Sequence, residues 1–471
     1  MSDTPEPGGI DLDDITLTES VMAITDHIRA VATPVPRDLD RRAADTLLRS
    51  YLEPACFPDA VRRLSTRHLL VLVGEEDMGK RLGAIALLSR MSLAEGRITV
   101  LSPAGSAADL LSRTEYGPGR AYLLHDWIAE STDRIELLNL ARKLAELGSY
   151  LVITRNGAPS RAVEVEQPWC APDPGDLFDL YLSSFGGATV PARAATARVR
   201  ALALPTPAEV VRLARRLVVD DEPMGEEVSA WFDTKPPMHE VRAVAALAFA
   251  HRLPEPEFAR QLDRFERIWQ AHEAGPQPTG GPHPLIGAHE GHTVFRLPHH
   301  RAQVLAELVA RYGFWLWQPL REWARSLAGQ GLDVQVRAAE GVALLAACSL
   351  REAQQEFLEV WARGGVAERL AAAGALSYMC ADEALATEAL RLALAWASDP
   401  ADPRATTAAV ALGGGLSLRH PADAVACLWR LASSEGPASG VARQSLALLH
   451  AQARARDDDH ARTMIRLVEE R

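Results

Sequence analysis

Short apolar runs alternate with helical stretches in the first third of the chain. Four runs of strand length occur at His68–Val73, Arg97–Ser102, Arg120–Asp126 and Ser149–Arg155, and the first is apolar almost throughout. Continuous apolar runs are typical of strands covered on both faces, and strands separated by helices form parallel βαβ units. The pattern therefore predicts an α/β domain with a mostly parallel sheet.

After residue 157 the pattern becomes helical. Thr206, Pro207 and Glu209 stand in the order of an N-cap, a first-turn proline and a capping-box glutamate, which predicts a helix from residue 206. Residues 276–294 are rich in Gly, Pro and His and predict a surface loop. From residue 295 onward the periodicity predicts helices only.

A loose repeat runs through the C-terminal helical region. Arginines at 337, 369, 404 and 443 are each followed by small residues and then by Leu or Val, in steps of 32, 35 and 39 residues. This pattern is typical of the inner helices of HEAT-like or armadillo-like hairpins, which must stack to bury their apolar faces. An irregular Ala-rich helical domain is the alternative.

The pattern divides the chain into five parts. They are a disordered N-terminus with one amphipathic helix (1–43), the α/β domain (44–204), a helical subdomain (205–275), the Gly/Pro/His-rich loop (276–294), and a helical region with HEAT-like repeats (295–471).

Composition narrows the class of protein. The chain has 471 residues, 48% of them hydrophobic and 24% charged, as expected of a globular protein with several domains. No apolar run reaches the length of a membrane span, and the acidic N-terminus does not resemble a signal peptide. The five cysteines are widely spaced, which favours the interpretation that they are small buried hydrophobic residues of a protein in a reducing compartment. We therefore expect a cytoplasmic protein without a membrane partner.

The segment after the first apolar run has the outline of a phosphate-binding loop. In "VGEEDMGKR", Gly74 is followed by four residues and then by Gly79 and Lys80. Glycines let backbone amides surround the phosphates of a nucleotide, and the lysine reaches the β- and γ-phosphates. Lysine is rare here, at three of the 50 basic residues, so its presence at this position supports the motif.

Polar residues at the ends of two later runs fit the same site. Asp126 ends the third run, where a Walker-B-type carboxylate would hold the water shell of Mg²⁺. Arg155 ends the fourth, where it would sense the γ-phosphate, and Glu130 would orient the attacking water. The carboxyl ends of strands in open α/β sheets are where ligands bind. The alternatives are a capping or loop carboxylate for Asp126, a solvated glutamate for Glu130 and a surface arginine for Arg155.

The series "VLVGEEDMGKR", "AYLLHD" and "LVITR", followed by helices and helical repeats, resembles the STAND class of P-loop NTPases. More narrowly, residues 44–330 resemble a subgroup common in actinobacteria. The resemblance implies a nucleotide-governed switch, with ATP and Mg²⁺ as cofactors and a repeat region that senses or scaffolds. It assigns Gly74, Gly79 and Lys80 to phosphate binding, Asp126 to the Mg²⁺ shell and Arg155 to the γ-phosphate sensor.

Two departures from the motif bear on activity. Arg81 stands where a Ser or Thr hydroxyl would bind Mg²⁺, and the loop contains Glu75, Glu76 and Asp77. A carboxylate about 4 Å from a phosphate oxygen costs about 1 kcal/mol in water and about 4 kcal/mol at an intermediate dielectric. Three carboxylates would offset much of a micromolar affinity of about 8 kcal/mol. We therefore expect weak or absent hydrolysis.

The function expected from the sequence is a nucleotide-regulated or pseudo-ATPase signalling scaffold that binds protein partners through its C-terminal repeats. An active Mg²⁺-dependent ATPase switch is the first alternative. A nucleic-acid-associated regulator is the second, although a net charge of −12 disfavours phosphate backbones as partners. Assembly into a homo-oligomer stays open. Six histidines between His272 and His300 favour a polar loop over a metal site, since their spacing is irregular.

Overall fold

The computed structural model of the protein describes ten stretches of the chain. They are residues 38–91, 97–112, 116–128, 134–160, 164–184, 191–219, 226–272, 283–382, 384–455 and 459–469. These residues divide into two units, one within Val35–Met224 and the other within Gly225–Arg471. The amphipathic helix predicted near the N-terminus lies outside the described residues.

A six-stranded sheet lies at the centre of the first unit, with the strand order β1-β3-β4-β5-β2-β6. Its strands are β1 (Asp38–Leu39), β2 (Leu69–Gly74), β3 (Ile98–Leu101), β4 (Ala121–Leu124), β5 (Tyr150–Asn156) and β6 (Glu166–Pro168). Strands β2 to β6 run parallel, and β1 pairs antiparallel with β3 at one edge. The predicted mostly parallel sheet is confirmed, since β2 to β5 fall on the four apolar runs.

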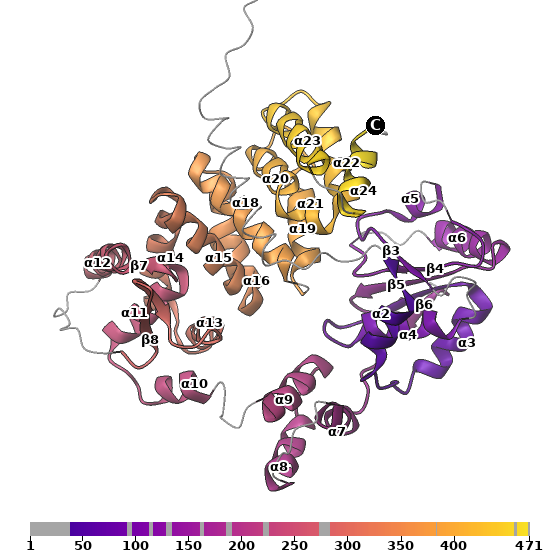
Figure 1. Cartoon of the computed structure of the whole chain (residues 1–471), viewed down its shortest axis with the longest axis horizontal. Helices are drawn as coiled ribbons and strands as arrows, with labels where there is room; N and C mark the ends of the chain where they lie inside the picture. The colour runs from indigo at the N-terminus through magenta and orange to yellow at the C-terminus, as the bar shows by residue number, and fades with distance from the viewer. Residues whose placement is uncertain are drawn as a thin grey trace, which may run out of the picture. The chain divides into compact units, whose positions relative to one another are not determined.

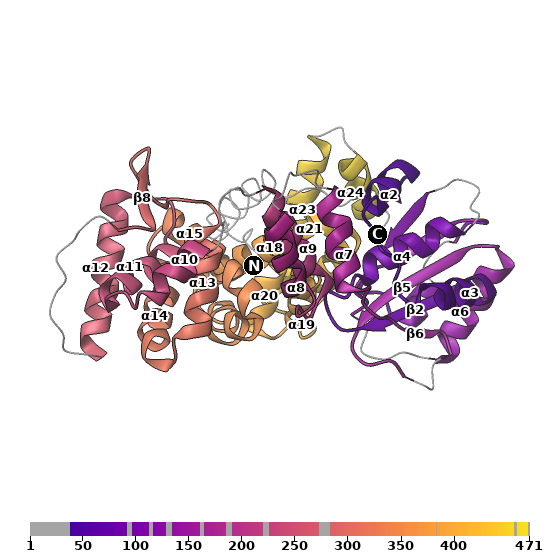
Figure 2. The ribbon, with the colours of Figure 1, turned by 90° about the horizontal axis from the view of Figure 1, so that it is seen from below.

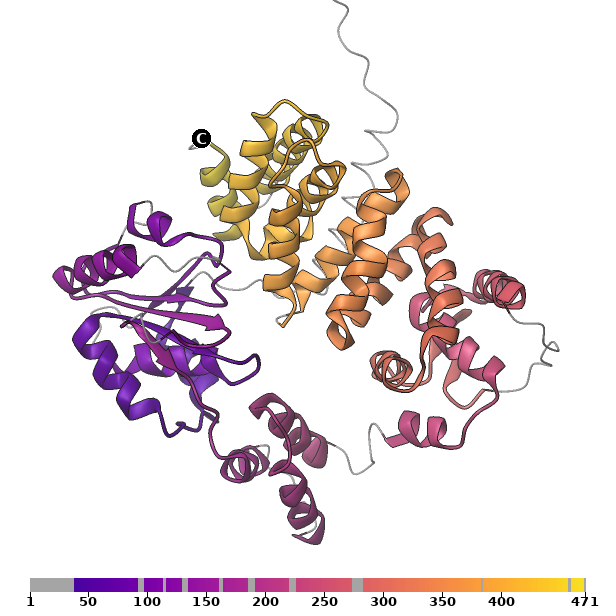
Figure 3. The same ribbon diagram turned by 180° about the vertical axis from the view of Figure 1, so that it is seen from behind.

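Helices cover both faces of this sheet (Figures 1 and 3). They are α2 (Arg41–Leu48), α3 (Phe57–Arg67) and α4 (Lys80–Arg90) on one face, with α5 (Ala107–Ser112) and α6 (Arg134–Glu146) on the other. Leu70 and Leu72 of β2 pack with the first group, whereas Leu69, Val71 and Val73 pack with the second. All five are at most 1% exposed, which explains why β2 lacks polar alternation.

The edge strand β6 has no apolar pattern and was not predicted. It consists of Glu166, Gln167 and Pro168, and proline is tolerated on an edge strand because no further strand needs its missing N–H. Glu166 and Gln167 are buried because arginines pair with them: Arg155 Nη2 donates to Glu166 at 2.8 Å and Arg63 Nη1 to Gln167 at 2.7 Å.

Three further helices belong to the first unit, namely α7 (Pro174–Ser184), α8 (Pro191–Ala201) and α9 (Pro207–Val219). The boundary predicted between residues 204 and 205 is therefore displaced, because α9 packs on α7 through Val210 and Phe178. The predicted start of α9 is confirmed, since Thr206 Oγ1 accepts a hydrogen bond from the Glu209 amide at 3.3 Å.

The second unit contains a small antiparallel sheet, and two of its strands form where the sequence predicts a loop. Its strands are β7 (Leu253–Pro254), β8 (Ile286–His289) and β9 (His292–Phe295), near helices α10 (Glu226–Asp233), α11 (Met238–Phe249) and α12 (Glu255–His272). Within the predicted loop 276–294, β8 and β9 instead form a hairpin that extends away from its neighbours (Figure 2). Glu290 and Gly291 both have positive φ, 51° and 75°, as a two-residue type I′ turn requires.

The remainder of the second unit is helical. Its elements are α13 (His300–Arg311), α14 (Phe314–Ser326), η1 (Leu327–Gly329), α15 (Leu332–Cys348), α16 (Leu350–Ala353), η2 (Gln354–Leu358), α17 (Glu359–Ala362), α18 (Val366–Ala381), α19 (Ala386–Trp396), α20 (Pro403–Gly413), α21 (Gly415–Arg419), α22 (Pro421–Ala432), α23 (Ala438–Arg454) and α24 (Asp459–Glu469). Helices α15, α18, α20 and α23 pack in succession, each against the next (Figure 1). The HEAT-like assignment itself stays a prediction.

The four arginines of the predicted repeat do not share one contact. Arg369 Nε donates to the carbonyl of Gly364 at 2.9 Å, whereas Arg443 Nη2 donates to Ser439 Oγ at 2.9 Å. Arg337 faces Glu340 at 3.5 Å. Their spacing therefore does not reflect a repeated interaction.

Buried tryptophans form a more regular series. Trp323, Trp361 and Trp396 are fully buried, and each indole Nε1 donates to an earlier segment. The acceptors are the carbonyls of Gln261 and Arg325 and the carboxylate of Glu359, at 2.9, 3.0 and 3.0 Å. Each indole thus fixes its helix to the preceding layer through one hydrogen bond as well as through packing.

Three tryptophans of α14, Trp315, Trp317 and Trp323, have few basic residues between them, which predicts a packing core in preference to a base-stacking surface. Trp317 and Trp323 are buried as expected, but Trp315 is 76% exposed. The prediction is wrong for Trp315 because this residue lies on the first turn of α14 and points away from the core.

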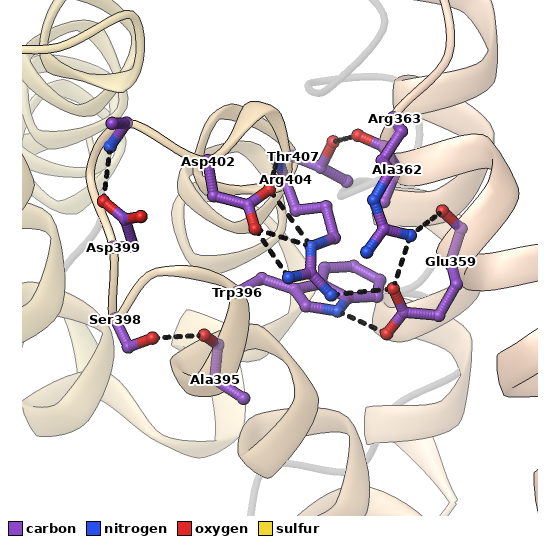
Figure 4. A network of polar contacts seen from close by, with 11 residues as sticks. Glu359, Ala362, Arg363, Ala395, Trp396, Ser398, Asp399, Asp402, Arg404 and Thr407 are labelled. Carbon is purple, nitrogen blue, oxygen red and sulfur yellow. Dashed lines mark hydrogen bonds and ion pairs between the residues drawn. The ribbon is translucent and has the colours of Figure 1, made fainter.

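A polar network joins α17, α19 and α20 (Figure 4). Glu359 accepts hydrogen bonds from Trp396 Nε1 at 3.0 Å, from Arg404 Nη1 at 2.8 Å and from Arg363 Nη1 at 2.9 Å. Asp402 caps α20 and pairs with the Arg404 guanidinium, whose hydrogen bond lowers the pKa of Asp402. Burial raises the pKa of Glu359, but the hydrogen bonds from Trp396 and Arg404 outweigh it, so this pKa is also lowered.

We predict that Arg404→Met destabilises the second unit by about 1–3 kcal/mol at pH 7, because two partly buried carboxylates lose a charged donor. Both carboxyl groups have lowered pKa values in the fold. Their contribution is therefore present at neutral pH and is lost as the pH falls below the ordinary carboxyl value of about 4. Urea denaturation at pH 7 and at low pH measures both effects.

The matched control is Arg391→Met on α19, whose ion pair with Glu388 is solvent-exposed and spans one helical turn. We expect it to change stability by less than about 0.5 kcal/mol. Equal losses for the two variants at pH 7 would show that the network contributes nothing beyond a surface ion pair.

Candidate functional site

The loop between β2 and α4 is a turn whose backbone carbonyls accept hydrogen bonds from the lysine at its end. Gly79 adopts a left-handed φ of 75° as the N-cap of α4, and Asp77 has a φ of 59°. Lys80, the first residue of α4, is 5% exposed. Its Nζ donates to the carbonyl of Gly74 at 3.1 Å and also to the carbonyl of Glu75. The ammonium group therefore lies inside the turn.

Charges from two strand ends converge on Lys80. Burial lowers the pKa of Lys80, and the carboxylates of Asp126, Glu76, Asp77 and Glu75 act in the opposite direction, with Asp126 the strongest. Asp126 follows β4, and β5 separates β4 from β2 in the sheet. The structure thus brings together two residues that the sequence predicted for one site.

The acidic residues of the loop are arranged differently from Asp126. Glu75, Glu76 and Asp77 are all exposed to solvent at the tip of the loop. Water and salt screen charges in such positions, so the cost to a bound anion is nearer to about 1 kcal/mol per carboxylate than to about 4.

Asp126 is held in place by a threonine of the neighbouring strand. Its φ is 51°, and its backbone N–H donates to Thr154 Oγ1 at 2.9 Å. His125 Nδ1 lies 2.9 Å from the same hydroxyl oxygen, and His125 Nε2 lies 3.3 Å from Asp126 Oδ2. A non-glycine residue with positive φ at a strand end is a strained feature that its surroundings must maintain.

Arg155 is engaged elsewhere. Side chains alternate along β5, so Arg155 shares a face with Ile153, on the side of α5 and α6, whereas Thr154 shares the opposite face with Val152. The Arg155 guanidinium forms an ion pair with the buried carboxylate of Glu166 at 2.8 Å. The predicted γ-phosphate contact of Arg155 stays a prediction.

The two remaining predicted site residues are Glu130 and Arg81. Glu130 lies outside the described residues. Arg81 is the second residue of α4 and is half-buried.

Trp169 packs against both the loop and helix α4. Its backbone N–H donates to the carbonyl of Val73 at 2.8 Å, and a Cβ on Gly74 would approach its carbonyl oxygen to 3.0 Å. A Cβ on Gly83 of α4 would overlap the indole ring. Glycines at these two positions therefore let the segment after β6 pack against both the loop and its helix.

Sequence reasoning missed His125, Thr154, Glu166 and Trp169. Thr154 and His125 stand at the polar ends of apolar runs, the same signal that identified Asp126. Glu166 begins an edge strand without an apolar pattern and Trp169 follows that strand, so nothing in the sequence linked them to the loop.

The arrangement combines one buried cation, the N-terminus of α4 and one supported carboxylate. A lysine at a helix N-terminus is suited to an anion such as phosphate. Among the residues that the structure describes, no group of three or more His, Cys, Asp and Glu side chains is arranged to hold a metal ion. Within the same residues, no helix combines the length and the hydropathy needed to cross a membrane.

No protein-family model matches the chain, and a search of curated proteins finds no significant match.

We predict that Gly83→Ala destabilises the first unit by about 1–3 kcal/mol, because the new methyl group overlaps the Trp169 ring. Helix propensity alone would favour alanine by about 1 kcal/mol. Thermal or urea denaturation followed by tryptophan fluorescence measures the change.

The control is Gly440→Ala in α23, where an added Cβ meets no atom within 4 Å. This variant is expected to be neutral or stabilising by up to about 1 kcal/mol. If Gly83→Ala behaves like Gly440→Ala, the close packing of Trp169 on α4 is refuted.

Proposed function

We propose that the protein is a nucleotide-responsive scaffold. In this proposal the loop 74–80 binds the phosphates of ATP, hydrolysis is weak or absent, and the helical second unit binds a protein partner. The observation that carries the first part is the convergence of Lys80 and Asp126 at the carboxyl ends of β2 and β4. The resemblance of the same segments to STAND-class NTPases supports it.

The residues present fit phosphate better than they fit a tightly bound metal ion. Lys80 and the N-terminal amides of α4 supply positive charge, but Lys80 must exchange its two loop carbonyls for phosphate oxygens. Arg81 offers no hydroxyl oxygen to Mg²⁺, so Asp126 would hold the ion through its water shell. Mg²⁺ bound with ATP neutralises phosphate charge during phosphoryl transfer. Weak hydrolysis follows from the missing direct ligand.

The exposed position of the acidic residues supports binding. At about 1 kcal/mol each before salt screening, Glu75, Glu76 and Asp77 together remove about 3 kcal/mol, well under the roughly 8 kcal/mol of a micromolar complex. They also favour the charged form of Lys80. Lys80 therefore supplies a cation for phosphate, while the three exposed carboxylates weaken the affinity of the loop for a phosphate ligand.

The nucleotide proposal predicts binding of a fluorescent ATP analogue that falls about tenfold or more in Lys80→Ala, because a charge-assisted hydrogen bond contributes about 1.5–3 kcal/mol. Arg62→Ala is the control, since it removes the same charge from an exposed position of the first unit. The variant Glu75→Gln/Glu76→Gln/Asp77→Asn is expected to bind about a hundredfold more tightly at low salt, where screening is weak. Titration by fluorescence anisotropy measures all four proteins.

Equal affinities of the unaltered protein and Lys80→Ala would refute phosphate binding at this loop. A further variant, Asp126→Asn, tests the alternative, an active ATPase, which the charge interaction between Asp126 and Lys80 favours. Phosphate release that disappears in Asp126→Asn would establish that alternative in place of a pseudo-ATPase.

Exposed aromatic side chains support the scaffold part of the proposal. Phe314 and Trp315 are adjacent on the first turn of α14, with exposed fractions of 64% and 76% and ring centroids 6.2 Å apart. Aromatic residues, Trp above all, are enriched where protein partners bind.

We predict that Phe314→Ser/Trp315→Ser abolishes retention of host proteins that the unaltered chain retains in a pull-down. Val199→Ser is the control, because Val199 is 69% exposed on α8 of the first unit. Quantitative mass spectrometry compares the three baits. Retention of the same proteins by all three would exclude the aromatic pair as the contact.

A further inference from the structure

Two cysteines that are distant in sequence meet next to the loop. Cys56 precedes α3, and Cys170 follows Trp169, 114 positions later. The backbone N–H of Cys170 donates to Cys56 Sγ at 3.3 Å, and the Cys170 side chain is close enough to change the pKa of the Cys56 thiol. The expectation that all five cysteines are separate buried hydrophobes is therefore wrong for this pair.

The pair is accessible and distinct from the other cysteines. Both thiols are free and belong to residues that are partly exposed. Cys380 and Cys427 are buried, and Cys348 is exposed on α15 of the second unit. The buried hydroxyl of Tyr51 lies near both thiols of the pair and has no hydrogen-bond partner within the described stretches.

We propose that Cys56 and Cys170 form an oxidation site. A peroxide, or a small disulfide such as oxidised glutathione, would oxidise the two thiols and join them in a reversible disulfide. With peroxide, one thiolate attacks a peroxide oxygen and becomes a sulfenic acid. The second thiol then attacks that sulfur and releases water. Two thiols and one hydrogen peroxide give one disulfide and two waters, and two electrons pass from sulfur to oxygen. With oxidised glutathione, one thiolate attacks a glutathione sulfur and releases one glutathione. The second thiol then attacks the mixed disulfide and releases the other, so that two electrons pass to the glutathione disulfide.

The position of the pair determines what the bond would restrain. It would tie the start of α3 to the residue after Trp169, whose backbone and ring pack on Gly74 and Gly83. A cross-link between such distant positions restricts the unfolded chain strongly and raises stability. In a reducing compartment, disulfides that do form are usually transient and serve in catalysis or redox sensing. The site does not depend on nucleotide binding.

Reaction at neutral pH is expected to be slow. Burial raises the pKa of the Cys56 thiol to about 11, and the neighbouring Cys170 side chain adds to this effect. The thiolate is the reactive form, so its fraction rises about tenfold per pH unit below that pKa. Cross-link formation should accelerate accordingly between pH 7 and pH 9.

The experiment uses the full chain carrying Cys348→Ser, which removes the exposed thiol that would join two molecules. The protein is treated with hydrogen peroxide or oxidised glutathione, alkylated and digested without reduction. We expect one cross-linked peptide pair containing Cys56 and Cys170, lost on adding dithiothreitol and absent in Cys56→Ser and in Cys170→Ser. Cys427→Ser is the control that keeps the cross-link.

A second measurement does not depend on those variants folding. The oxidised Cys348→Ser chain should unfold at a higher urea concentration than its reduced form. The proposal is overturned if Cys56 and Cys170 are recovered as separate glutathione adducts or sulfinic acids. It is also overturned if both stay reduced under conditions that oxidise Cys348 in the unaltered chain.

Discussion

The burial of β2 on both faces is the constraint on which the first unit depends. Alternate side chains of this strand enter two separate hydrophobic clusters, one with α3 and α4 and one with α5 and α6. Every hydrophobic side chain of the strand is withdrawn from water, at about 1.5–3 kcal/mol for each Leu or Val. The strand's position and direction are thereby fixed, and so is the point at which the chain leaves the sheet at Gly74. The loop is therefore anchored by packing, whatever its charges.

The same burial explains which features could be predicted from the sequence. Strands β2 to β5 carry apolar runs because two layers of helices cover them, and Thr206 marks the start of α9 by local capping chemistry. By contrast, β6 is held by pairing of its polar side chains with Arg63 and Arg155, which leaves no hydrophobic period to read. The β8–β9 hairpin is specified by two turn residues within a stretch whose composition indicates a loop.

The candidate site was predictable only where the chemistry lies at strand ends. Gly74 and Lys80 could be found from the spacing of a phosphate-binding loop after an apolar run, and Asp126 because a polar residue after such a run falls on the edge of a parallel sheet. For Arg155 the same rule is insufficient, because alternation along β5 directs its side chain to Glu166, on the side of α5 and α6. The threonine before it reaches Asp126 instead. The sequence thus predicts the edge of the sheet at which a polar residue lies more easily than the face to which its side chain points. The reason is that neighbouring residues of a strand point to opposite faces.

The charge distribution of the loop has a consequence for how a ligand would be recognised. Its three carboxylates are exposed and its lysine is buried, so the two signs act in different dielectric surroundings. Salt weakens the repulsion at the rim far more than it weakens an attraction inside the turn. Affinity for a phosphate ligand at this loop should therefore change little, or even rise, over a range of ionic strength in which binding at an exposed basic surface falls steeply. That opposite dependence follows from burial alone and separates a recessed cation from a surface one.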